Sequence, residues 1–253
     1  MSTHFLERFI NADTVFDLRH AYFDAMRHFG FAQVLYAARF MASIPPEISP
    51  SPVELHSNFP PTLAEALAEQ DLIAASVWSD WARQGPGSIA TRSLYETAAA
   101  RLDQDAALQL ASAHGLAAGQ VVSLRDRVLR GQGTILLVPF AGASHAEADR
   151  IWERSHREVM IHSWVLHMRM ATLRHDTARV RLTTRQREVL EWKAAGKTVA
   201  DIATILAVTP ATVEKHLRLA RDALAAGNTA QAILKAHLTH QLFVQEHAGQ
   251  AGR

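Results

Sequence analysis

Three consecutive helix-start signals lie in residues 182–232, and they constrain the fold more than any other feature of the chain. Thr183 followed by Gln186 is typical of a capping box, in which two side chains satisfy the free amides of a first turn. A glycine can end this helix at positive φ, so the first helix is predicted over residues 184–195. Thr198 then caps a short second helix that has an acidic residue in its first turn. A helix this short must be stabilised by packing against its neighbours.

The third helix is predicted to begin at Thr209, with Pro210 at the first helical position, where proline is tolerated. It continues to Ala226, before Gly227. Its inward stripe has apolar residues at spacings of four, three and four, namely Val213, Leu217, Ala220 and Leu224. Its opposite face is charged and contains Glu214, Lys215, Arg218, Arg221 and Asp222. With a tight turn before it, this pattern predicts a helix-turn-helix.

The outward face of the third helix has the side chains that major-groove entry requires. Arg218 and Lys215 are predicted to reach guanine edges, and Glu214 to accept from cytosine. Five basic or hydroxyl side chains are better placed for phosphates, namely Lys197, Thr198, Thr209, Thr212 and Arg221, and the N-termini of the second and third helices add free amides there. The alternative is that an amphipathic helix with a solvated charged face only closes a helical core.

The order of residues in this stretch resembles the LuxR-type DNA-binding domain. The matching motifs are L-T-x-R-x-x-E-V-L at 182–190, A-x-G-K-T at 194–198, I-A-x-I-L at 202–206 and T-V-x-x-H at 212–216. The resemblance implies DNA binding and argues against a purely structural helix. The chain departs from the family, which usually has Asn, Lys and Arg, at Leu219, Ala223 and Thr229. Affinity and operator are therefore expected to differ from those usual in the family.

Length and composition place a second domain ahead of this one. The chain has 253 residues, which at about 100–200 residues per domain predicts two domains. Its net charge of +1 requires any DNA binding to come from local basicity. It has no cysteine, which excludes disulfides and thiolate sites. The 14 histidines suggest a metal site at His237 with His240 or at His162 with His167, but no carboxylate partner is evident and no metal is assigned.

The N-terminal half is predicted to form helices around a small sheet. Residues 4–29 have helical spacing with a break at Asp13 or Thr14, and strands are predicted at 31–40 and 53–56, separated by a proline-rich loop. Residues 62–84 and 94–114 are predicted to be mostly helical, 121–129 and 134–140 to form a β-hairpin, and 145–173 to form a long helix.

These elements predict an α+β fold, with an N-terminal α-β-α sandwich followed by an all-α, four-helix helix-turn-helix domain. The expected division is 1–174 for sensing and dimerisation, 175–181 for the linker and 182–253 for DNA binding. The first part also resembles the ligand-sensing domain of LuxR-type quorum regulators. This resemblance is carried by Asn58-Phe59-Pro60, by residues 113–116 and by the hairpin that follows.

The sensing half departs from the family at the positions that hold an acyl-homoserine lactone. An ungapped count from Asn58 puts Phe59 at the tyrosine of the family's N-Y-P, Leu63 at its tryptophan and Leu67 at its next tyrosine. Ser76 stands at the aspartate that accepts from the ligand's amide. Each lost charge-assisted hydrogen bond costs about 1.5–3 kcal/mol, and about 1.4 kcal/mol is tenfold in affinity. A standard lactone is therefore expected to bind weakly.

Six residues are predicted to line a more apolar pocket, namely Tyr36, Phe59, Leu63, Leu67, Ser76 and Trp78. A shifted alignment would instead make Asp71 or Asp80 the missing carboxylate and Trp78 or Trp81 the aromatic wall. The two leucines are equally consistent with core packing in a domain that has no pocket.

The combined expectation is a dimeric LuxR-type regulator with no enzymatic activity, no cofactor and no membrane contact. It would act in the cytoplasm, bind a near-palindromic operator in double-stranded DNA and contact RNA polymerase. Its signal would be small and apolar, or it would act without ligand. The alternatives are a true lactone receptor and an inhibitory heterodimer partner. A phosphorylated receiver domain is disfavoured because the strand at 31–40 follows two helices and contains no Asp.

Overall fold

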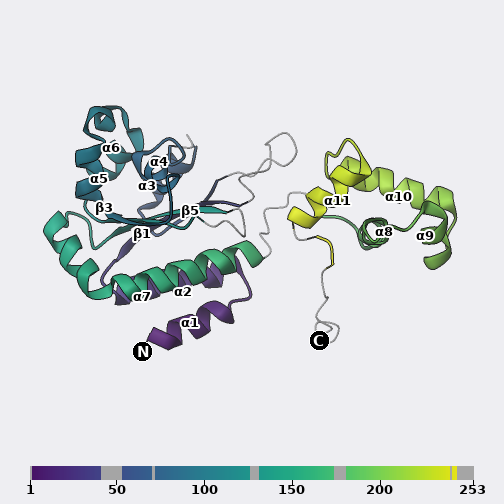
Figure 1. Cartoon of the computed structure of the whole chain (residues 1–253), viewed down its shortest axis with the longest axis horizontal. Coiled ribbons are helices and arrows are strands. Elements are labelled where there is room, and N and C mark those ends of the chain that lie inside the picture. The colour runs from purple at the N-terminus through teal and green to yellow at the C-terminus, as the bar shows by residue number, and fades with distance from the viewer. Residues whose placement is uncertain are drawn as a thin grey trace. The chain divides into compact units, whose positions relative to one another are not determined.

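The described residues of this computed structural model form two compact units (Figure 1). They are residues 2–40, 53–69, 72–125, 131–173, 181–239 and 241–243. One unit ends at Leu173, and the described part of the other begins at Arg181. Apart from Arg181, the predicted linker 175–181 lies outside the described residues.

The first unit is built on a five-stranded antiparallel sheet with the order β2-β1-β5-β4-β3. Its strands are β1 (Gln33–Arg39), β2 (Glu54–Ser57), β3 (Gly87–Ala90), β4 (Gln120–Ser123) and β5 (Gln132–Val138). The two early strands and the β4–β5 pairing were predicted and are confirmed. The short edge strand β3 was missed, because the glycines and proline before it indicate only a turn.

Two helices, α2 (Val15–His28) and α7 (His145–Thr172), cover one face of the sheet, and α1 (Ser2–Ile10) packs against both of them on the side away from the sheet. Thr14 caps α2 by accepting from the amide of Asp17, which confirms the predicted break. Ser144 and Glu147 form a capping box at the start of α7. Phe9, Tyr22 and Val159 pack with the sheet in one apolar cluster. The long predicted helix is thus confirmed as one side of the sandwich.

Shorter helices cover the other face, namely α3 (Pro61–Glu69), α4 (Val77–Ala82), α5 (Thr91–Thr97) and α6 (Ala106–Ala113), with a 3-10 turn at Ala99–Gln104. The mostly helical character predicted over 62–84 and 94–114 is confirmed, and the structure divides each stretch into shorter helices. Ser76 and Asp105 each begin a new helix by accepting from a backbone amide three residues on. Periodicity alone does not show such restarts, because apolar residues continue across them.

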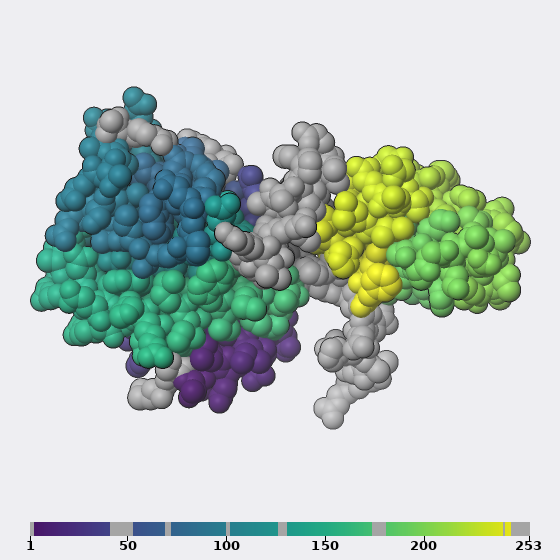
Figure 2. Space-filling view, viewed as in Figure 1, coloured from purple at the N-terminus to yellow at the C-terminus, as the bar shows by residue number. Residues whose placement is uncertain are grey.

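The second unit contains four helices, α8 (Thr184–Ala194), α9 (Val199–Ile205), α10 (Pro210–Ala223) and α11 (Thr229–Leu238), which Figure 2 shows as closely packed green to yellow atoms. The predicted capping box at Thr183 is confirmed, and the predicted cap at Thr198 is also a capping box, formed with Asp201. The Thr209 cap is also confirmed, and Val213 is buried in the core of the unit.

The third helix of this unit ends earlier than predicted. The prediction extended it to Ala226, whereas α10 ends at Ala223 and Ala225 takes a φ of 47°. The amide of Ala226 donates to the carbonyl of Arg221 at 2.9 Å and closes the turn. The residue in the left-handed conformation is thus Ala225 and not Gly227. The position of Gly227 in the sequence therefore predicted the wrong end for the helix.

Candidate ligand and DNA-binding sites

The exposed side of α10 carries the three residues predicted to read bases. Glu214, Lys215 and Arg218 are all exposed, whereas the other side of the helix is buried in the core. The guanidinium of Arg218 lies 3.6 Å from a carboxylate oxygen of Asp222, and its side chain remains 60% exposed. An exposed pair of this kind contributes little to stability, so Arg218 is free to exchange it for a base edge.

The five residues predicted to contact phosphate lie at the starts of α9 and α10 and along α10. Lys197, Thr198 and Thr209 are exposed, whereas Thr212 and Arg221 are half-buried. The Thr198 hydroxyl donates to Asp201 Oδ2 at 2.7 Å, and the hydroxyls of Thr209 and Thr212 lie 2.9 Å apart. These hydroxyls are therefore already hydrogen-bonded, which leaves backbone amides and the lysine as the more available donors.

The charge of the second unit suits an anionic partner. Residues 181–243 contain nine Lys and Arg against five Asp and Glu, in a chain whose net charge is only +1. The pKa of Asp201 is lowered because the hydroxyl and amide of Thr198 donate to its carboxylate. That carboxylate is thereby committed to the cap of α9, and the basic side chains dominate the remaining surface.

On the sheet of the first unit, five of the six predicted pocket residues come together. Phe59, Leu63, Leu67 and Trp78 belong to one buried cluster under α3 to α6, and the buried Ser76 begins α4 beside them. Leu35, from β1, belongs to the same cluster. The structure thus groups these five side chains, although they come from separate segments.

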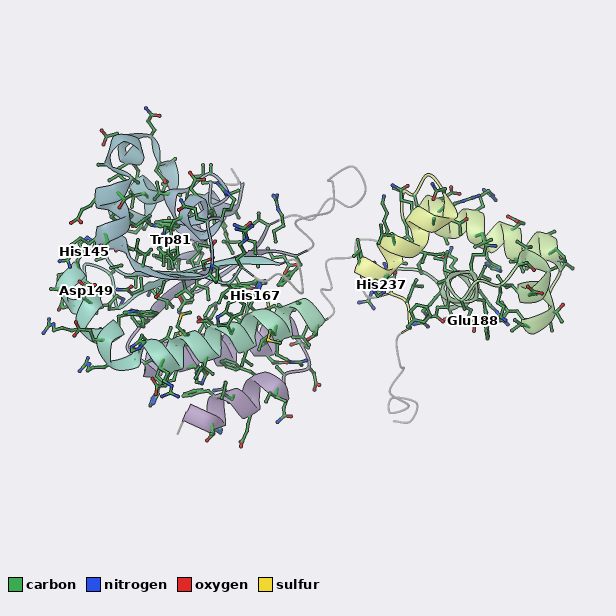
Figure 3. All side chains as sticks on the ribbon, in the orientation of Figure 1. Trp81, His145, Asp149, His167, Glu188 and His237 are labelled. Atoms are coloured by element: carbon green, nitrogen blue, oxygen red, sulfur yellow. The ribbon has the colours of Figure 1, made fainter. Side chains whose placement is uncertain are left out.

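Tyr36 does not join this group. Side chains of a strand alternate between its two faces, so Tyr36 points to the face opposite Leu35 and Ala37 and packs with α1, α2 and α7. Its phenol oxygen lies 2.8 Å from Nδ1 of His167, which Figure 3 labels on α7. The sheet therefore separates Tyr36 from the other predicted pocket residues.

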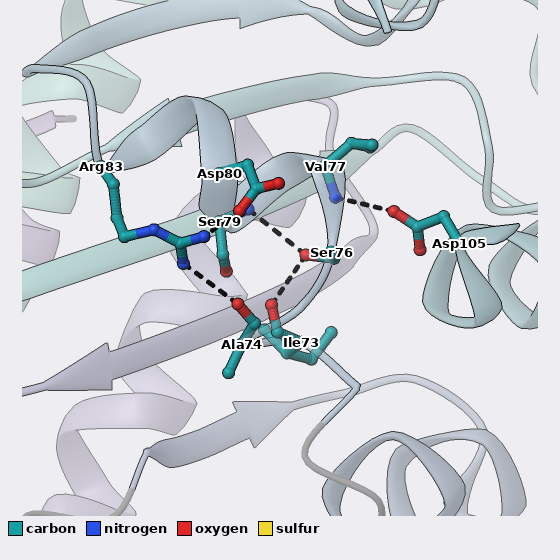
Figure 4. A network of polar contacts seen from close by, with 8 residues as sticks. All are labelled: Ile73, Ala74, Ser76, Val77, Ser79, Asp80, Arg83 and Asp105. Carbon is teal, nitrogen blue, oxygen red and sulfur yellow. Dashed lines mark hydrogen bonds and ion pairs between the residues drawn. The ribbon is translucent and has the colours of Figure 1, made fainter. Parts of the chain in front are cut away.

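Ser76 is occupied as a helix cap (Figure 4). Its hydroxyl accepts from the amide of Ser79 at 3.3 Å and donates to the carbonyl of Ile73 at 2.8 Å. The next amide, of Val77, donates to Asp105 Oδ2 at 2.7 Å. Asp105 Oδ1 accepts from Leu108 at 2.9 Å, so one buried carboxylate holds the N-termini of α4 and α6 together.

Trp78 is also satisfied within the chain. Its indole N–H donates to the phenol oxygen of Tyr95 at 3.1 Å, and that phenol donates to the carbonyl of Ala117 at 3.1 Å. Burial is the main cause that raises the pKa of Tyr95, so the phenol stays protonated. The sequence interpretation missed Tyr95 and Asp105, because neither belongs to a recognisable motif and both act through contacts with distant segments.

The shifted alignment names Asp71 or Asp80 as the carboxylate, and Asp80 already has a partner. Asp80 pairs with Arg83, which also donates to the carbonyl of Ala74 at 3.0 Å (Figure 4). Trp81 packs against the edge of the apolar cluster. Asp71 lies outside the described residues.

The histidines considered as metal ligands have other partners or surroundings. His162 is buried, with its Nδ1 2.6 Å from the carbonyl of Glu158 and its ring edge-on to Phe29. His237 lies on α11, and His240 lies outside the described residues (Figure 3). Within the described parts of the chain, no group of three or more His, Cys, Asp or Glu side chains could hold a metal ion. None of the helices described there is long and apolar enough to cross a membrane.

Two protein families match successive parts of the chain. Residues 14–192 match the autoinducer binding domain, and residues 180–236 match the bacterial regulatory proteins of the luxR family. The transcriptional activator protein AhyR of Aeromonas hydrophila is 30% identical over 208 residues, which cover 78% of this chain and 76% of the relative. The quorum sensing-dependent regulator RpaR of Rhodopseudomonas palustris is 47% identical over 58 residues, 23% of this chain and 24% of that protein.

Solved structures show the same fold. SdiA in complex with octanoyl-rac-glycerol has a TM-score of 0.55 at 20% identity and covers 94% of this chain and 93% of its own. A crystal structure of Escherichia coli SdiA has the same TM-score at 20% identity, over 95% of this chain and 97% of its own. The family model of the C-terminal part and the relative that spans most of the chain are those of transcriptional regulators, not of enzymes. This chain belongs to the LuxR family, with an autoinducer-binding domain followed by a helix-turn-helix DNA-binding domain.

Proposed function

We propose that this protein is a dimeric LuxR-type regulator whose sensing unit takes a small apolar signal other than a standard acyl-homoserine lactone, or folds without one. The proposal rests on one observation: the polar side-chain groups of the five grouped residues already have hydrogen-bond partners within the chain. The hydroxyl of Ser76 and the indole of Trp78 both have intramolecular partners, and Phe59, Leu63 and Leu67 offer no polar atom. A polar head group would have to displace these bonds.

The cost of displacing these hydrogen bonds favours an apolar ligand over a lactone. A buried polar group that loses its partner costs about 1–3 kcal/mol, so a lactone that displaces Trp78 from Tyr95 must replace that bond with one at least as good. An apolar ligand needs only to replace the packing contacts of the cluster. Asp105 does not offer an uncommitted carboxylate, because both of its oxygens already accept from backbone amides.

For DNA, we propose that α10 enters the major groove with Arg218, Lys215 and Glu214 on base edges. The exposure of these three residues, and the excess of basic residues in the second unit, support this arrangement. Lys197 and the amides at the starts of α9 and α10 would then bind phosphates and set the register of the protein on the duplex.

Dimerisation is proposed through α7 and α11, each of which has exposed apolar side chains. Ile161 is 45% and Met168 is 54% exposed, and their spacing of seven puts them on one side of α7. Leu234 on α11 is 38% exposed. A two-fold dimer would present two copies of α10 about one helical turn of DNA apart, which predicts a near-palindromic operator and leaves other surfaces for RNA polymerase.

The switching mechanism we propose is a shift of population. A signal that binds only the folded, dimerisation-competent sensing unit stabilises that state, and the affinity for DNA follows. A stable, operator-binding dimer in the absence of any added signal would contradict this mechanism and would favour ligand-free action.

The experiment that tests the signal class is thermal unfolding of the full chain with a panel of acyl-homoserine lactones and with octanoyl-rac-glycerol. A ligand at 100 times its Kd adds about 2.7 kcal/mol, or roughly 5–10 °C for a chain of this size. We expect no such shift from the lactones. Leu67→Phe, which adds volume inside the cluster, should reduce any shift, whereas Ala68→Phe on the exposed side of α3 should leave it unchanged.

Two other functions make different predictions. A lactone receptor, favoured by the similarity to a quorum sensing-dependent regulator, would show the full shift with a lactone. An inhibitory heterodimer partner, favoured by the departures at Leu219, Ala223 and Thr229, would co-purify with another regulator and bind no duplex as a homodimer.

A further inference from the structure

The C-terminal end of α10 is held by a lysine of the next helix. Nζ of Lys235, on α11, donates to the carbonyl of Ala225 at 2.7 Å and to that of Leu224 at 3.2 Å. One turn earlier on α11, Oε1 of Gln231 accepts from the amide of Gly227 at 2.6 Å. Residues four apart share one face of a helix, so this face of α11 is directed at the end of α10.

These contacts provide hydrogen-bond donors at the C-terminal end of α10. The last carbonyls of a helix have no partner within it and carry the negative end of its dipole, which favours a cation there. The chain leaves α10 through Ala225 at a φ of 47°, a conformation that is costly for an L-residue. The ammonium of Lys235 binds the carbonyls on both sides of the bend, and it therefore fixes the direction in which the chain turns into α11.

Two further sets of residues give α11 different surroundings on its other sides. Ala232 and Ala236 are buried in the core of the unit, so α11 cannot move freely against it. Leu234 is partly exposed and His237 is exposed, so another side of the helix remains open. One face of α11 thus binds the end of α10, and another face leaves the apolar side chain of Leu234 exposed.

We propose that Lys235 is a positioning residue for DNA recognition. By fixing the end of α10 to α11, it sets the angle at which Lys215 and Arg218 are presented relative to the open face of α11. This inference rests on the proposed function, in which α10 enters the groove and α11 pairs the two units. It assigns Lys235 no direct contact with DNA, because its ammonium is used by the two carbonyls.

The test compares three variants of the full chain. Lys235→Met keeps the aliphatic stem and removes the ammonium, and Lys235→Arg restores a cation with several donors. Lys193→Met is the matched control, since it removes one charge from the end of α8, where Lys193 donates to the carbonyl of Lys197. The DNA probe is the duplex that the unmodified protein enriches from a random pool, and a scrambled duplex measures non-specific binding.

Three readouts are expected to separate positioning from other roles. In Lys235→Met, the amides of residues 224–226 should exchange hydrogen faster, and affinity for the enriched duplex should fall about two- to fivefold, the range that a cation at a helix C-terminus supports. Binding to the scrambled duplex and the salt dependence should not change. Lys235→Arg should recover most of the affinity, and Lys193→Met should leave the exchange at the end of α10 as it is.

Several outcomes would overturn the inference. A salt slope reduced by about one would make Lys235 a phosphate contact. Unchanged hydrogen exchange at residues 224–226 in Lys235→Met would show that Lys235 does not hold the end of α10. Unchanged affinity for the enriched duplex, together with a lower unfolding temperature, would leave Lys235 only a structural role. If the unmodified protein enriches no duplex at all, the proposed function itself fails, and this result is distinct from a failure of the Lys235 variants.

Discussion

The phenol oxygen of Tyr36 lies 2.8 Å from Nδ1 of His167 and joins the second strand of the sheet order to the C-terminal half of α7. Both residues are buried, and the ring of Phe40 stacks on His167 at a centroid distance of 5.0 Å. Burial, with a smaller effect of Glu54, raises the pKa of Tyr36 well above its usual value. The phenol therefore stays protonated, and Tyr36 contributes to the packing of α7 and not to the cluster of Phe59, Leu63, Leu67 and Trp78.

The close packing of His167 makes Gly133 sensitive to substitution. A Cβ added there would lie 2.9 Å from His167 Nδ1 and 3.2 Å from Leu124 Cβ. Gly133→Ala is expected to lower the free energy of unfolding by about 1–3 kcal/mol, measured by urea denaturation. Gly85→Ala is the control, since nothing lies within 4 Å of its added Cβ. Equal effects of the two substitutions would show that His167 gives way easily.

Tyr95→Phe should destabilise the sensing unit, because it removes the acceptor of the Trp78 indole and the donor to the Ala117 carbonyl. Trp78 is fully buried, so water cannot replace the lost partner. We expect a loss of about 1–3 kcal/mol in the free energy of unfolding. Thr97→Val, at an exposed position of the same helix, should change it by less than about 0.5 kcal/mol. A stable Tyr95→Phe protein would argue against the closed polar network on which the proposed signal class depends.

Ala207→Gly should stabilise the DNA-binding unit. Ala207 lies in the turn before α10 with a φ of 53°, where an L-residue pays about 1–2 kcal/mol and glycine does not. A glycine also makes the unfolded chain more flexible, which offsets part of this gain. The free energy of unfolding is therefore expected to rise by about 0.5–1 kcal/mol, as measured by thermal unfolding. Ala211→Gly, inside α10, should have the opposite sign because its backbone is helical. A loss of stability in Ala207→Gly would contradict the assigned turn.

The cap of α9 predicts a dependence on pH. The pKa of Asp201 is lowered from 3.8 by hydrogen bonds from the hydroxyl and amide of Thr198. Because the folded pKa is the lower one, the cap stabilises the unit above the unfolded value, and this contribution is lost as pH falls through the folded pKa. In Thr198→Val, the pKa of Asp201 should rise toward 3.8, as measured by carboxyl-carbon NMR titration. The pKa of Glu147, lowered by Ser144 in α7, should be unaffected and serves as the control.

Arg218→Ala and Lys197→Ala should separate base reading from phosphate binding. A lost bidentate guanine contact costs about 1–3 kcal/mol of discrimination between cognate and scrambled duplexes. Lys197→Ala should weaken both duplexes alike and reduce the salt slope by about one. Equal loss on both duplexes for Arg218→Ala would move Arg218 to the phosphate contacts. Fluorescence anisotropy at several salt concentrations measures both effects.

Local signals predicted the second unit in most of its details. The caps at Thr183, Thr198 and Thr209 act within three residues of themselves, so the sequence contains the information for each helix start. The end of α10 was misplaced because it depends on Ala225 in a left-handed conformation and on Lys235 from another helix. A contact between two helices leaves no signal in either of them alone.

The candidate sites divide in the same way. The exposed basic face of α10 follows from one helical period, and it was predicted. The placement of Tyr36 depends on which face of β1 meets α7. Because β1 is buried on both sides, its successive residues are apolar or aromatic, and the sequence pattern does not show which residues point to which face of the sheet. The indole of Trp78 donates to Tyr95 of α5 and the amide of Val77 donates to Asp105, and both partners lie beyond the range of any local pattern.

The sequence by itself determined the family, the two-part organisation of helices and strands and the exposed charged face of α10, because caps, periodicity and motif spacing act over a few residues. The tertiary structure decided that Tyr36 faces α7, that Tyr95 and Asp105 bind the indole of Trp78 and the amide of Val77, and that Lys235 holds the end of α10. These contacts join residues from different elements. They exist only once hydrophobic burial has brought those elements together and left each buried polar atom in need of a partner.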